Sequence, residues 1–157
     1  MTTIAFGNGI LAADTLATNS QGKVISENFG KIFDVEGKGY TLNGYNVRAY
    51  ALAGFVFSRL SFDAVLEQGL QVGSTLDTDD DFSAIVVTEG ASYAVSKEDD
   101  NPNIRIIEIP DGVYWAIGSG ADIARYVMQT GGDAVKAVIE ACKVDVSSGG
   151  EVDVWQK

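Results

Sequence analysis

The sequence predicts an α+β fold, and three features of the chain carry that prediction. Strand signals dominate the first third, a single helical period follows them, and a second group of strand signals precedes two helices and a closing strand. This order is not the regular alternation that gives a parallel sheet, so we expect antiparallel strands with the helices segregated from them. The 157 residues contain no internal repeat and no linker, which predicts a single domain over residues 1–157.

The first third of the chain is predicted to be a β-meander. Its strand signals are short apolar runs bounded by turn residues, and Asn8-Gly9 and Asn43-Gly44 are dipeptides that tight hairpin turns prefer. The expected strands are residues 2–6, 10–14, 23–25, 31–33, 40–42 and 47–52.

The period of the sequence changes at Phe55, from which we expect a helix to about Gln68. The positions that follow this helical period are Phe57, Leu60, Ser61, Ala64 and Leu66. Residues 69–81 are polar and rich in turn formers, and strands are expected again at 82–88, 92–96, 104–109 and 113–117.

Two helices and a strand are predicted for the rest of the chain. The first helix is expected to open at Ser119, whose hydroxyl would be the N-cap, with Asp122 three residues further on in an approximate capping box. The second helix begins near Asp133, and residues 151–155 alternate like a strand.

Charge and hydropathy exclude several classes of protein. Lys and Arg number 11 and Asp and Glu number 22, a formal net charge of −11 that argues against a nucleic-acid backbone as the main partner. No apolar run approaches the roughly 20 residues of a membrane helix, and no basic leader precedes an apolar core. We therefore expect a cytoplasmic protein that binds neither nucleic acid nor membrane. Cys142 cannot form an internal disulfide and is expected in the core.

The chain contains no histidine, which is the most informative absence in its composition. Ser-His and Cys-His nucleophile systems, and histidine-ligated zinc, are excluded within this chain. Proton transfer would have to use carboxylates, lysine, tyrosine or the terminal amine. The acidic run from Asp77 to Asp81 lacks the Gly and Glu that an EF-hand loop needs at its sixth and twelfth positions, where Phe82 and Thr88 stand. We expect a solvated loop there, and no metal.

Thr2 is a candidate nucleophile because it follows the initiator methionine. Removal of Met1 would leave Thr2 with a hydroxyl and a free α-amine, whose reference pKa is about 7.7–8.0. An N-terminal threonine activated by its own amine is an established form of nucleophilic catalysis. Met-Thr is a common beginning for a protein, so this signal depends on the rest of the chain.

Two charged residues at strand ends could support such a nucleophile. Asp14 ends an apolar strand, where an unpaired carboxylate would be costly, and Lys31 opens a later strand. A buried Asp14–Lys31 pair would place a fixed ammonium where it could stabilise an alkoxide and keep a neighbouring amine neutral. The alternative is an ordinary surface charge at each position.

Two glycine-containing junctions carry further candidates. Ser119 lies between two glycines and either caps a helix, relays a proton, or does both. Asp145 and Ser148 lie in a loop that ends in Gly149-Gly150. Either this loop only ends the helix, or its Asp145 and Ser148 side chains also orient a terminal amine.

Six motifs of the chain, in order, resemble those of proteasome β-type subunits, and among these the bacterial HslV-type peptidases. They are Thr2-Thr3-Ile4, Ala13-Asp14, Lys31, Leu52-Ala53-Gly54, Gly118-Ser119-Gly120 and Asp145-x-x-Ser148-Gly149-Gly150. Each motif is weak alone, but their order over almost the whole chain is specific. The resemblance implies an N-terminal-nucleophile hydrolase fold, which is a four-layer α-β-β-α sandwich. It also implies peptide hydrolysis inside a homo-oligomeric ring, an AAA+ unfoldase partner, and no cofactor.

The resemblance assigns a role to each motif residue. Thr2 would be the nucleophile and, through its amine, the base, while Lys31 would lower the barrier electrostatically and Asp14 would orient it. The Gly54 N–H would donate to the tetrahedral oxyanion. The remaining three residues, Ser119, Asp145 and Ser148, would hold the amine and its proton network.

The same resemblance implies a pocket for the side chain before the cleaved bond. Its residues would be Ala17, Thr18, Phe29, Leu52 and Val56, a largely apolar set that predicts cleavage after hydrophobic residues. The hairpin between Thr2 and Asp14 is a few residues shorter than is usual in the family, so the site depends on its strand register.

The same residues allow two other hypotheses besides a peptidase. One is an inactive proteasome-fold subunit that keeps the glycine junctions for structural reasons. The other is an N-terminal-nucleophile amidase that acts on small molecules. Any catalytic role for Thr2 requires the removal of Met1, because a retained methionine acylates the amine.

Overall fold

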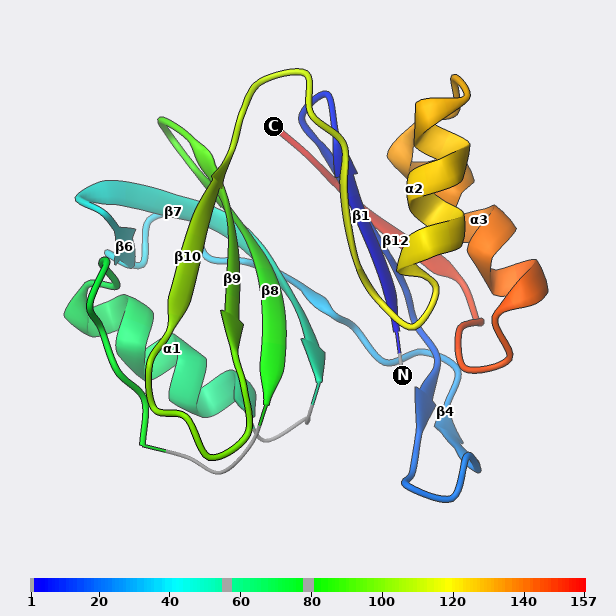
Figure 1. Ribbon diagram of the computed structural model, residues 1–157, viewed down its shortest axis with the longest axis horizontal. Helices are drawn as coiled ribbons and strands as arrows, with labels where there is room; N and C mark the ends of the chain where they lie inside the picture. Colours follow the sequence, from blue (N-terminus) through cyan, green and yellow to red (C-terminus); the bar gives the residue numbers. More distant parts are fainter. Residues whose placement is uncertain (1, 55–57, 78–80) are drawn as a thin grey trace. The chain divides into compact units, whose positions relative to one another are not determined.

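The computed structural model describes residues 2–54, 58–77 and 81–157, and its elements fall into two units (Figure 1). The first unit contains the residues up to Ile32 and those from Asp111 onward, and the second runs from Phe33 to Pro110. Each unit has its own sheet and its own helix or helices. Among the described residues, no helix is long and apolar enough to cross a membrane. The single-domain organisation stays a prediction.

The first unit is built on a four-stranded antiparallel sheet in the order β11-β1-β2-β12. Its strands are β1 (Thr3–Gly7), β2 (Ile10–Asp14), β11 (Trp115–Gly118) and β12 (Val152–Gln156). The strands β1 and β2 pair from Ile4↔Ala13 to Gly7↔Ile10, which leaves Asn8 and Gly9 as a two-residue turn. Both turn residues have positive φ, 51° and 77°, as a primed hairpin turn requires. The shortened hairpin is therefore a regular one.

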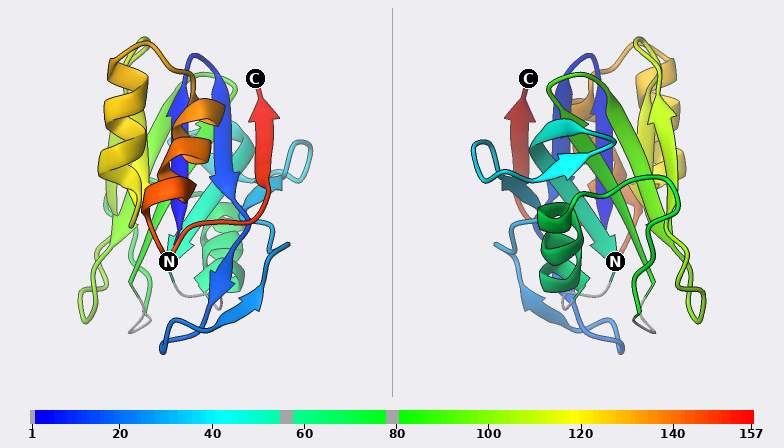
Figure 2. Two further views of the ribbon diagram at one scale, coloured as in Figure 1. Left: turned by 90° about the vertical axis from the view of Figure 1, so that its right-hand side faces the viewer. Right: turned by 90° about the vertical axis from the view of Figure 1, so that its left-hand side faces the viewer.

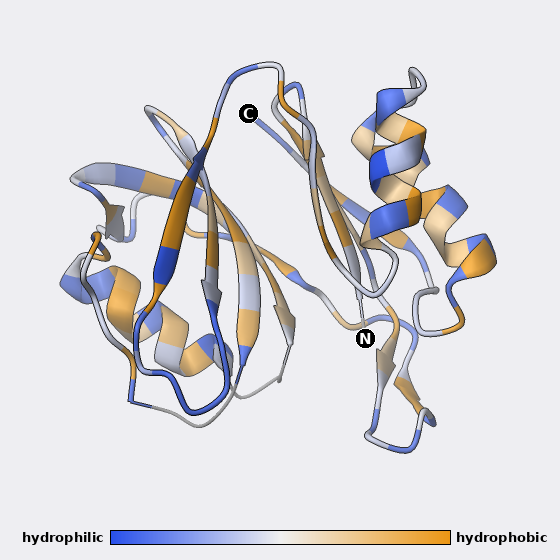
Figure 3. Cartoon of the chain, in the orientation of Figure 1, coloured by the Kyte–Doolittle hydropathy of each residue, from blue (hydrophilic) through white to orange (hydrophobic). Residues whose placement is uncertain are grey.

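Two helices cover one face of this sheet (Figure 2, left). They are α2 (Ala121–Gln129) and α3 (Ala134–Val144), and their amphipathic sequences are visible in Figure 3. The buried residues between helices and sheet are mostly alanines, which allow the helices to approach the strands closely. The prediction for α3 is confirmed at its start, where Asp133 is the N-cap and accepts from the Lys136 N–H. Cys142 is half-buried against this core.

The first third of the chain is not a meander, which corrects the prediction from sequence. Its strands are divided among three sheets: β1 and β2 join the sheet of the first unit, and β3 (Ala17–Thr18) and β4 (Val24–Ser26) form a separate ribbon. The later strands β5 (Ile32–Asp34), β6 (Thr41–Leu42) and β7 (Tyr45–Gly54) belong to the other sheet. The neighbour of β2 is the C-terminal β12, a pairing that local sequence does not encode.

The second unit contains a six-stranded sheet in the order β10-β9-β8-β7-β5, with β6 paired to β7. Its other strands are β8 (Phe82–Thr88), β9 (Ser92–Lys97) and β10 (Arg105–Ile109). The β6–β7 turn is again the predicted Asn-Gly dipeptide, with Asn43 at φ 49° and Gly44 at φ 83°. The predicted strands are thus present, with ends shifted by a few residues.

Helix α1 (Ser58–Gln68) covers the sheet of the second unit (Figure 2, right), and the predicted stripe is confirmed at Leu66 but not at Leu60. Phe57, also in that stripe, lies outside the described residues. The buried residues of the helix are Ser58, Phe62 and Leu66, whereas Leu60 is 76% exposed. Phe62 packs edge-on against Tyr50, with ring centroids 5.1 Å apart. This aromatic contact and the Tyr50 hydroxyl, which donates to Asp63 over 2.5 Å, hold the helix in its register.

Helices packed on antiparallel sheets confirm the α+β prediction at the level of each unit. The stacking of the layers into a four-layer sandwich stays a prediction. Residues 69–77 contain no helix, as expected from their polar sequence. The acidic run at Asp77–Asp81 lies partly outside the described residues, at 78–80.

Candidate active site

Thr2 lies at the point where the first unit brings two chain segments together. The antiparallel pair of β1 and β11 matches Thr3 with Gly118, so Thr2 lies just before β1, beside Ser119, which lies just after β11. The Ser119 Oγ is 3.4 Å from the Thr2 carbonyl oxygen. Thr2 is 6% exposed, and Met1 lies outside the described residues. Strand register therefore places the predicted nucleophile next to a predicted support residue.

The Gly-Ser-Gly motif is explained by close contact with the N-terminal residues. Gly118 has φ 94°, a left-handed conformation, and a Cβ there would overlap the Thr2 carbonyl oxygen. A Cβ at Gly120 would overlap the Thr3 Oγ1. Both glycines are needed because the backbone after β11 passes directly against Thr2 and Thr3.

Ser119 does not cap the following helix, which corrects the prediction from sequence. The N-cap of α2 is Gly120, with no side-chain cap, and the predicted capping box with Asp122 is absent. The Ser119 Oγ donates instead to Asp145 Oδ2 over 2.5 Å. The N-cap position falls one residue after Ser119, and the Ser119 hydroxyl is free to form a charge-assisted hydrogen bond to the carboxylate.

Asp145 collects several hydrogen bonds at the C-terminal end of α3, where it is the C-cap. The Ser148 Oγ donates to its Oδ2 over 2.6 Å, and the Ser147 N–H donates to its Oδ1 over 3.2 Å. Burial acts to raise the pKa of Asp145, but the hydrogen bonds from Ser119 and Ser148 outweigh it, and the pKa lies below its ordinary value. Asp145 is therefore an ionised acceptor at neutral pH. The helix-stop prediction is confirmed, because Asp145 ends α3. That this loop orients a terminal amine stays a prediction.

Asp14 and Lys31 form a buried ion pair in the same unit. The Lys31 Nζ lies 2.7 Å from Asp14 Oδ1 and donates also to the Leu16 carbonyl over 2.8 Å. Asp14 Oδ1 accepts in addition from the Thr3 N–H over 3.0 Å, and its Oδ2 accepts from the Gly149 N–H over 3.1 Å. Asp14 is fully buried and Lys31 is 5% exposed. Hydrogen bonds to both carboxylate oxygens are what makes such a buried charge tolerable.

Burial lowers the pKa of Lys31 below its ordinary value, and the nearby Asp14 carboxylate opposes that shift without cancelling it. The ammonium is thus paired but poorly solvated, a state that suits a fixed positive charge beside a reacting group. The thiol of Cys142 titrates in the same surroundings, where burial raises its pKa to about 11 and leaves it protonated at neutral pH.

Two residues of the site were given no role in the sequence prediction. Thr3 is fully buried; its N–H donates to Asp14, and its Oγ1 lies 2.7 Å from Ser148 Oγ. The Gly149 N–H donates to Asp14 from the loop that also holds Asp145 and Ser148. The repeated threonine and the double glycine were visible in the sequence, but their contacts depend on the pairing of β1 with β11 and of β2 with β12.

Six of the seven predicted catalytic residues belong to the first unit, and Gly54 belongs to the second. Gly54 ends β7 with φ 127°, and a Cβ there would crowd the Asp81 carbonyl oxygen, so the backbone itself requires glycine. Its role toward an oxyanion at Thr2 stays a prediction. Of the predicted pocket residues, Ala17, Thr18 and Phe29 are half-buried in the first unit, Leu52 is buried in the second, and Val56 lies outside the described residues.

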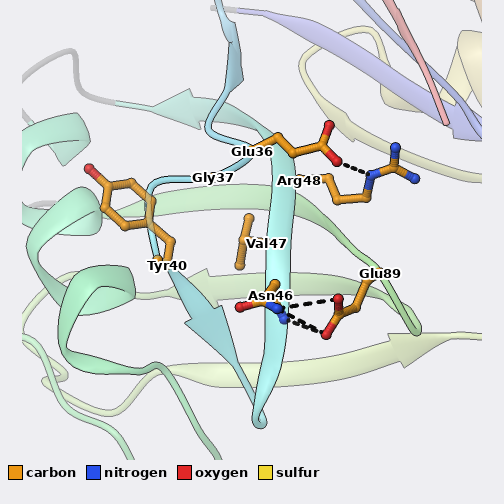
Figure 4. A pocket seen from close by; sticks show the side chains of 8 residues that line it. Glu36, Gly37, Tyr40, Asn46, Val47, Arg48 and Glu89 are labelled. Carbon is orange, nitrogen blue, oxygen red and sulfur yellow. Dashed lines mark hydrogen bonds and ion pairs between the residues drawn. The ribbon is translucent and has the colours of Figure 1, made fainter.

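A pocket of about 420 Å³ lies in the second unit and contains none of the predicted catalytic residues (Figure 4). Its walls include two ion or hydrogen-bonded pairs, Glu36 with Arg48 at 3.3 Å and Asn46 with Glu89 at 3.2 Å. Glu36 follows β5, Arg48 and Asn46 lie in β7, and Glu89 follows β8. We assign no role to this pocket.

Comparison with known proteins gives a match at the level of the fold. No protein-family model and no curated protein matches the sequence. Among solved structures, the eukaryotic HslV from Trypanosoma brucei matches with a TM-score of 0.65 at 19% identity, over 98% of this chain and 97% of that one. BPH of Thiobacillus denitrificans matches with a TM-score of 0.63 at 17% identity, over 98% of this chain and 95% of that one. The complex of BPH with epoxomicin matches with a TM-score of 0.60 at 17% identity, over 98% of this chain and 96% of that one.

The class of fold follows from this geometry and these comparisons. The chain has an HslV and proteasome β-type fold, as the order of its sequence motifs indicates. The likeness extends over nearly the full length of both chains in each comparison.

Proposed function

We propose that this protein is a threonine-type endopeptidase in which Thr2, freed by the removal of Met1, is the nucleophile. One observation carries the proposal: Thr2 lies between the buried Asp14–Lys31 pair and the Ser119–Asp145–Ser148 network, within a single unit of the structure. A chain without histidine has few other ways to activate a hydroxyl, and a terminal amine is one of them.

The proposed reaction begins with proton transfer from the Thr2 hydroxyl to its own α-amine. The oxygen attacks the substrate carbonyl, and the Lys31 ammonium favours the charge that develops on the threonine oxygen. The Gly54 N–H is proposed as a donor to the oxyanion of the tetrahedral intermediate. The ammonium of Thr2 then gives its proton to the departing amine, which leaves an ester on Thr2. Water hydrolyses this ester with the amine again as base.

The supporting residues have distinct proposed tasks. Asp14 orients Lys31, because its Oδ1 binds both the Lys31 ammonium and the Thr3 N–H. Ser119 and Ser148 both donate to Asp145, so their oxygen lone pairs remain available as acceptors for N–H groups of the Thr2 amine or of the chain. Asp145 keeps the hydrogen of each hydroxyl pointed toward its own carboxylate.

The proposal extends to the assembly of the protein and to its substrate preference. The likeness of fold to HslV supports a homo-oligomeric ring in the cytoplasm, with an AAA+ unfoldase as partner and unfolded chains as substrates. The native mass of the purified protein tests the ring. The apolar residues Phe29 and Leu52 support cleavage after hydrophobic residues. A panel of fluorogenic peptides tests this preference, and a preference for acidic or basic residues would contradict it.

The catalytic proposal is tested with Thr2→Ala and Thr2→Ser. Peptide hydrolysis should be lost in Thr2→Ala and retained in part in Thr2→Ser, which keeps a hydroxyl beside the amine. Epoxomicin, the compound in the BPH complex, should inhibit the wild-type protein. Full peptidase activity in Thr2→Ala contradicts the proposal. A folded wild-type protein without Met1 that hydrolyses no peptide points instead to an inactive subunit, and one that hydrolyses only small amides points to an amidase.

A further inference from the structure

Thr3 is held by hydrogen bonds at both its backbone and its side chain. It has no exposed surface, its N–H donates to Asp14 Oδ1 over 3.0 Å, and its Oγ1 lies 2.7 Å from Ser148 Oγ. Asp14 pairs with Lys31 and Ser148 pairs with Asp145, so Thr3 is hydrogen-bonded to one member of each of these two groups. It also directly follows the proposed nucleophile in the chain.

The direction of the Thr3 hydrogen bond follows from counting donors. The hydroxyl oxygens of Ser119 and Ser148 lie 2.5 Å and 2.6 Å from Asp145 Oδ2. The ionised carboxylate can only accept, so both hydroxyl hydrogens must point toward it. Ser148 has a single hydroxyl hydrogen, and it is used in this way. The oxygen of Ser148 can therefore only accept from Thr3, and the Thr3 hydroxyl must be the donor.

The result is a directed chain of hydrogen bonds that ends on one carboxylate. Thr3 donates to Ser148, Ser148 donates to Asp145, and Ser119 donates to Asp145 from the other side. Bonds in such a chain polarise one another, so the Thr3 hydroxyl strengthens the bond from Ser148 to Asp145. The Gly120 position leaves the room that the Thr3 Oγ1 occupies, which explains why a glycine stands there.

We propose that the Thr3 hydroxyl is a positioning group for the Thr2 nucleophile, acting through Ser148 on Asp145 while the Thr3 N–H holds Asp14. This inference rests on the proposed peptidase function. Thr3 does not touch the substrate in this scheme. It fixes the direction of the hydroxyls around Asp145, and it holds the peptide bond between Thr2 and Thr3 at a defined distance from both charged groups.

The test compares Thr3→Val, which keeps the branched shape but loses the hydroxyl, with Thr3→Ser, which keeps the hydroxyl. Intact mass confirms the removal of Met1 in each variant, and peptide hydrolysis is followed from about pH 5 to about pH 9. We expect Thr3→Val to lower kcat about tenfold with little change in KM, as for the loss of one hydrogen bond. The acid limb of its pH profile should move to higher pH, because the less stabilised Asp145 holds a neighbouring ammonium more strongly. Thr3→Ser should restore both quantities.

A double-variant cycle separates action through Ser148 from a general effect on packing. In a Ser148→Ala background, the change Thr3→Val should have little further effect on kcat, because the chain is already broken. Equal losses in Thr3→Val and Thr3→Ser, or full additivity with Ser148→Ala, would overturn the proposal. If Thr3→Val does not fold, Thr3→Ala takes its place in the same comparison with Thr3→Ser. Wild-type kinetics in Thr3→Val, with Thr2→Ala inactive, would overturn this inference alone; activity in Thr2→Ala would overturn the proposed function itself.

Discussion

The hydroxyl of Ser119 donates to Asp145 Oδ2 over 2.5 Å, and this bond joins the end of β11 to the end of α3. Both residues stand at the C-terminal boundary of an element, where the backbone has left its regular pattern. Ser119 contacts the Thr2 carbonyl oxygen, and Asp14 of the Asp14–Lys31 pair contacts the N–H of the next residue, Thr3. The catalytic proposal depends on these two groups being held together by the sheet of the first unit.

Changing Asp145 to Asn should remove part of the acid sensitivity of the fold. Burial acts to raise the pKa of Asp145, but the hydrogen bonds from Ser119 and Ser148 lower it by more than burial raises it. The pKa of Asp145 in the folded protein therefore lies below the ordinary 3.8. A carboxyl with a depressed folded pKa stabilises the protein above its unfolded pKa and loses that contribution as the pH falls through the folded pKa. The difference in the free energy of unfolding between wild type and Asp145→Asn should therefore become smaller below about pH 4. Denaturant unfolding measures this difference. Asp122→Asn, on the exposed face of α2, is the control and should show no such narrowing.

Replacing Lys31 by Met should destabilise the protein by about 3–5 kcal/mol, because the buried Asp14 carboxylate would lose its charged partner. Urea unfolding measures this loss. The double variant Asp14→Asn with Lys31→Met should recover part of it, since no buried charge then remains. Lys143→Met breaks an exposed pair with Glu140 and should change stability little. Equal effects at Lys31 and Lys143 would show that the Asp14–Lys31 pair is not buried as described.

Replacing Gly118 by Ala should disturb the N-terminal residues, because the added Cβ would overlap the Thr2 carbonyl oxygen. The matched control is Gly131→Ala in the same unit. Gly131 has a similar positive φ of 104°, with no atom within 4 Å of a Cβ. Gly131→Ala should cost about 1–2 kcal/mol of stability through backbone strain and leave peptidase activity intact. Gly118→Ala should cost more and abolish activity. Activity that survives in Gly118→Ala would contradict the close approach of these segments.

Removing the hydroxyl of Ser119 or of Ser148 should each lower kcat by roughly 10- to 100-fold, because Asp145 would lose a donor to its Oδ2. The double variant should lose less than the product of the two single losses, since both hydroxyls act on the same oxygen. Ser147→Ala is the control, because Ser147 reaches Asp145 through its backbone N–H, which the substitution keeps. Losses that multiply fully would show that the two serines act independently.

Local sequence patterns predicted most of the elements, because turns, strands and helices depend on short-range signals. The roles of the candidate site residues stay predictions. The Asn8-Gly9 and Asn43-Gly44 turns are formed by residues that tolerate positive φ, and they appear where expected. The pairing of Asp14 with Lys31 follows from the cost of leaving a buried charge alone beside apolar strands.

The errors come from partners that lie far away in the chain. Ser119 has the sequence environment of an N-cap, but the N-cap is Gly120, and the Ser119 hydroxyl donates to Asp145, 26 residues later. Helix α1 turns Phe62 rather than Leu60 inward because Tyr50 and Asp63 hold it there. The role of Thr3 needs the strand pairing that brings Gly118 and Ser148 beside it, and no local pattern contains that information.

The catalytic role of Thr2 is tested most directly by the intact mass of protein whose peptidase activity is measured in the same sample. Preparations with different extents of methionine removal should show activity in proportion to the fraction of chains that lack Met1, since only those chains carry a free amine on Thr2. Full activity in protein whose chains all retain Met1 would contradict the catalytic role of Thr2.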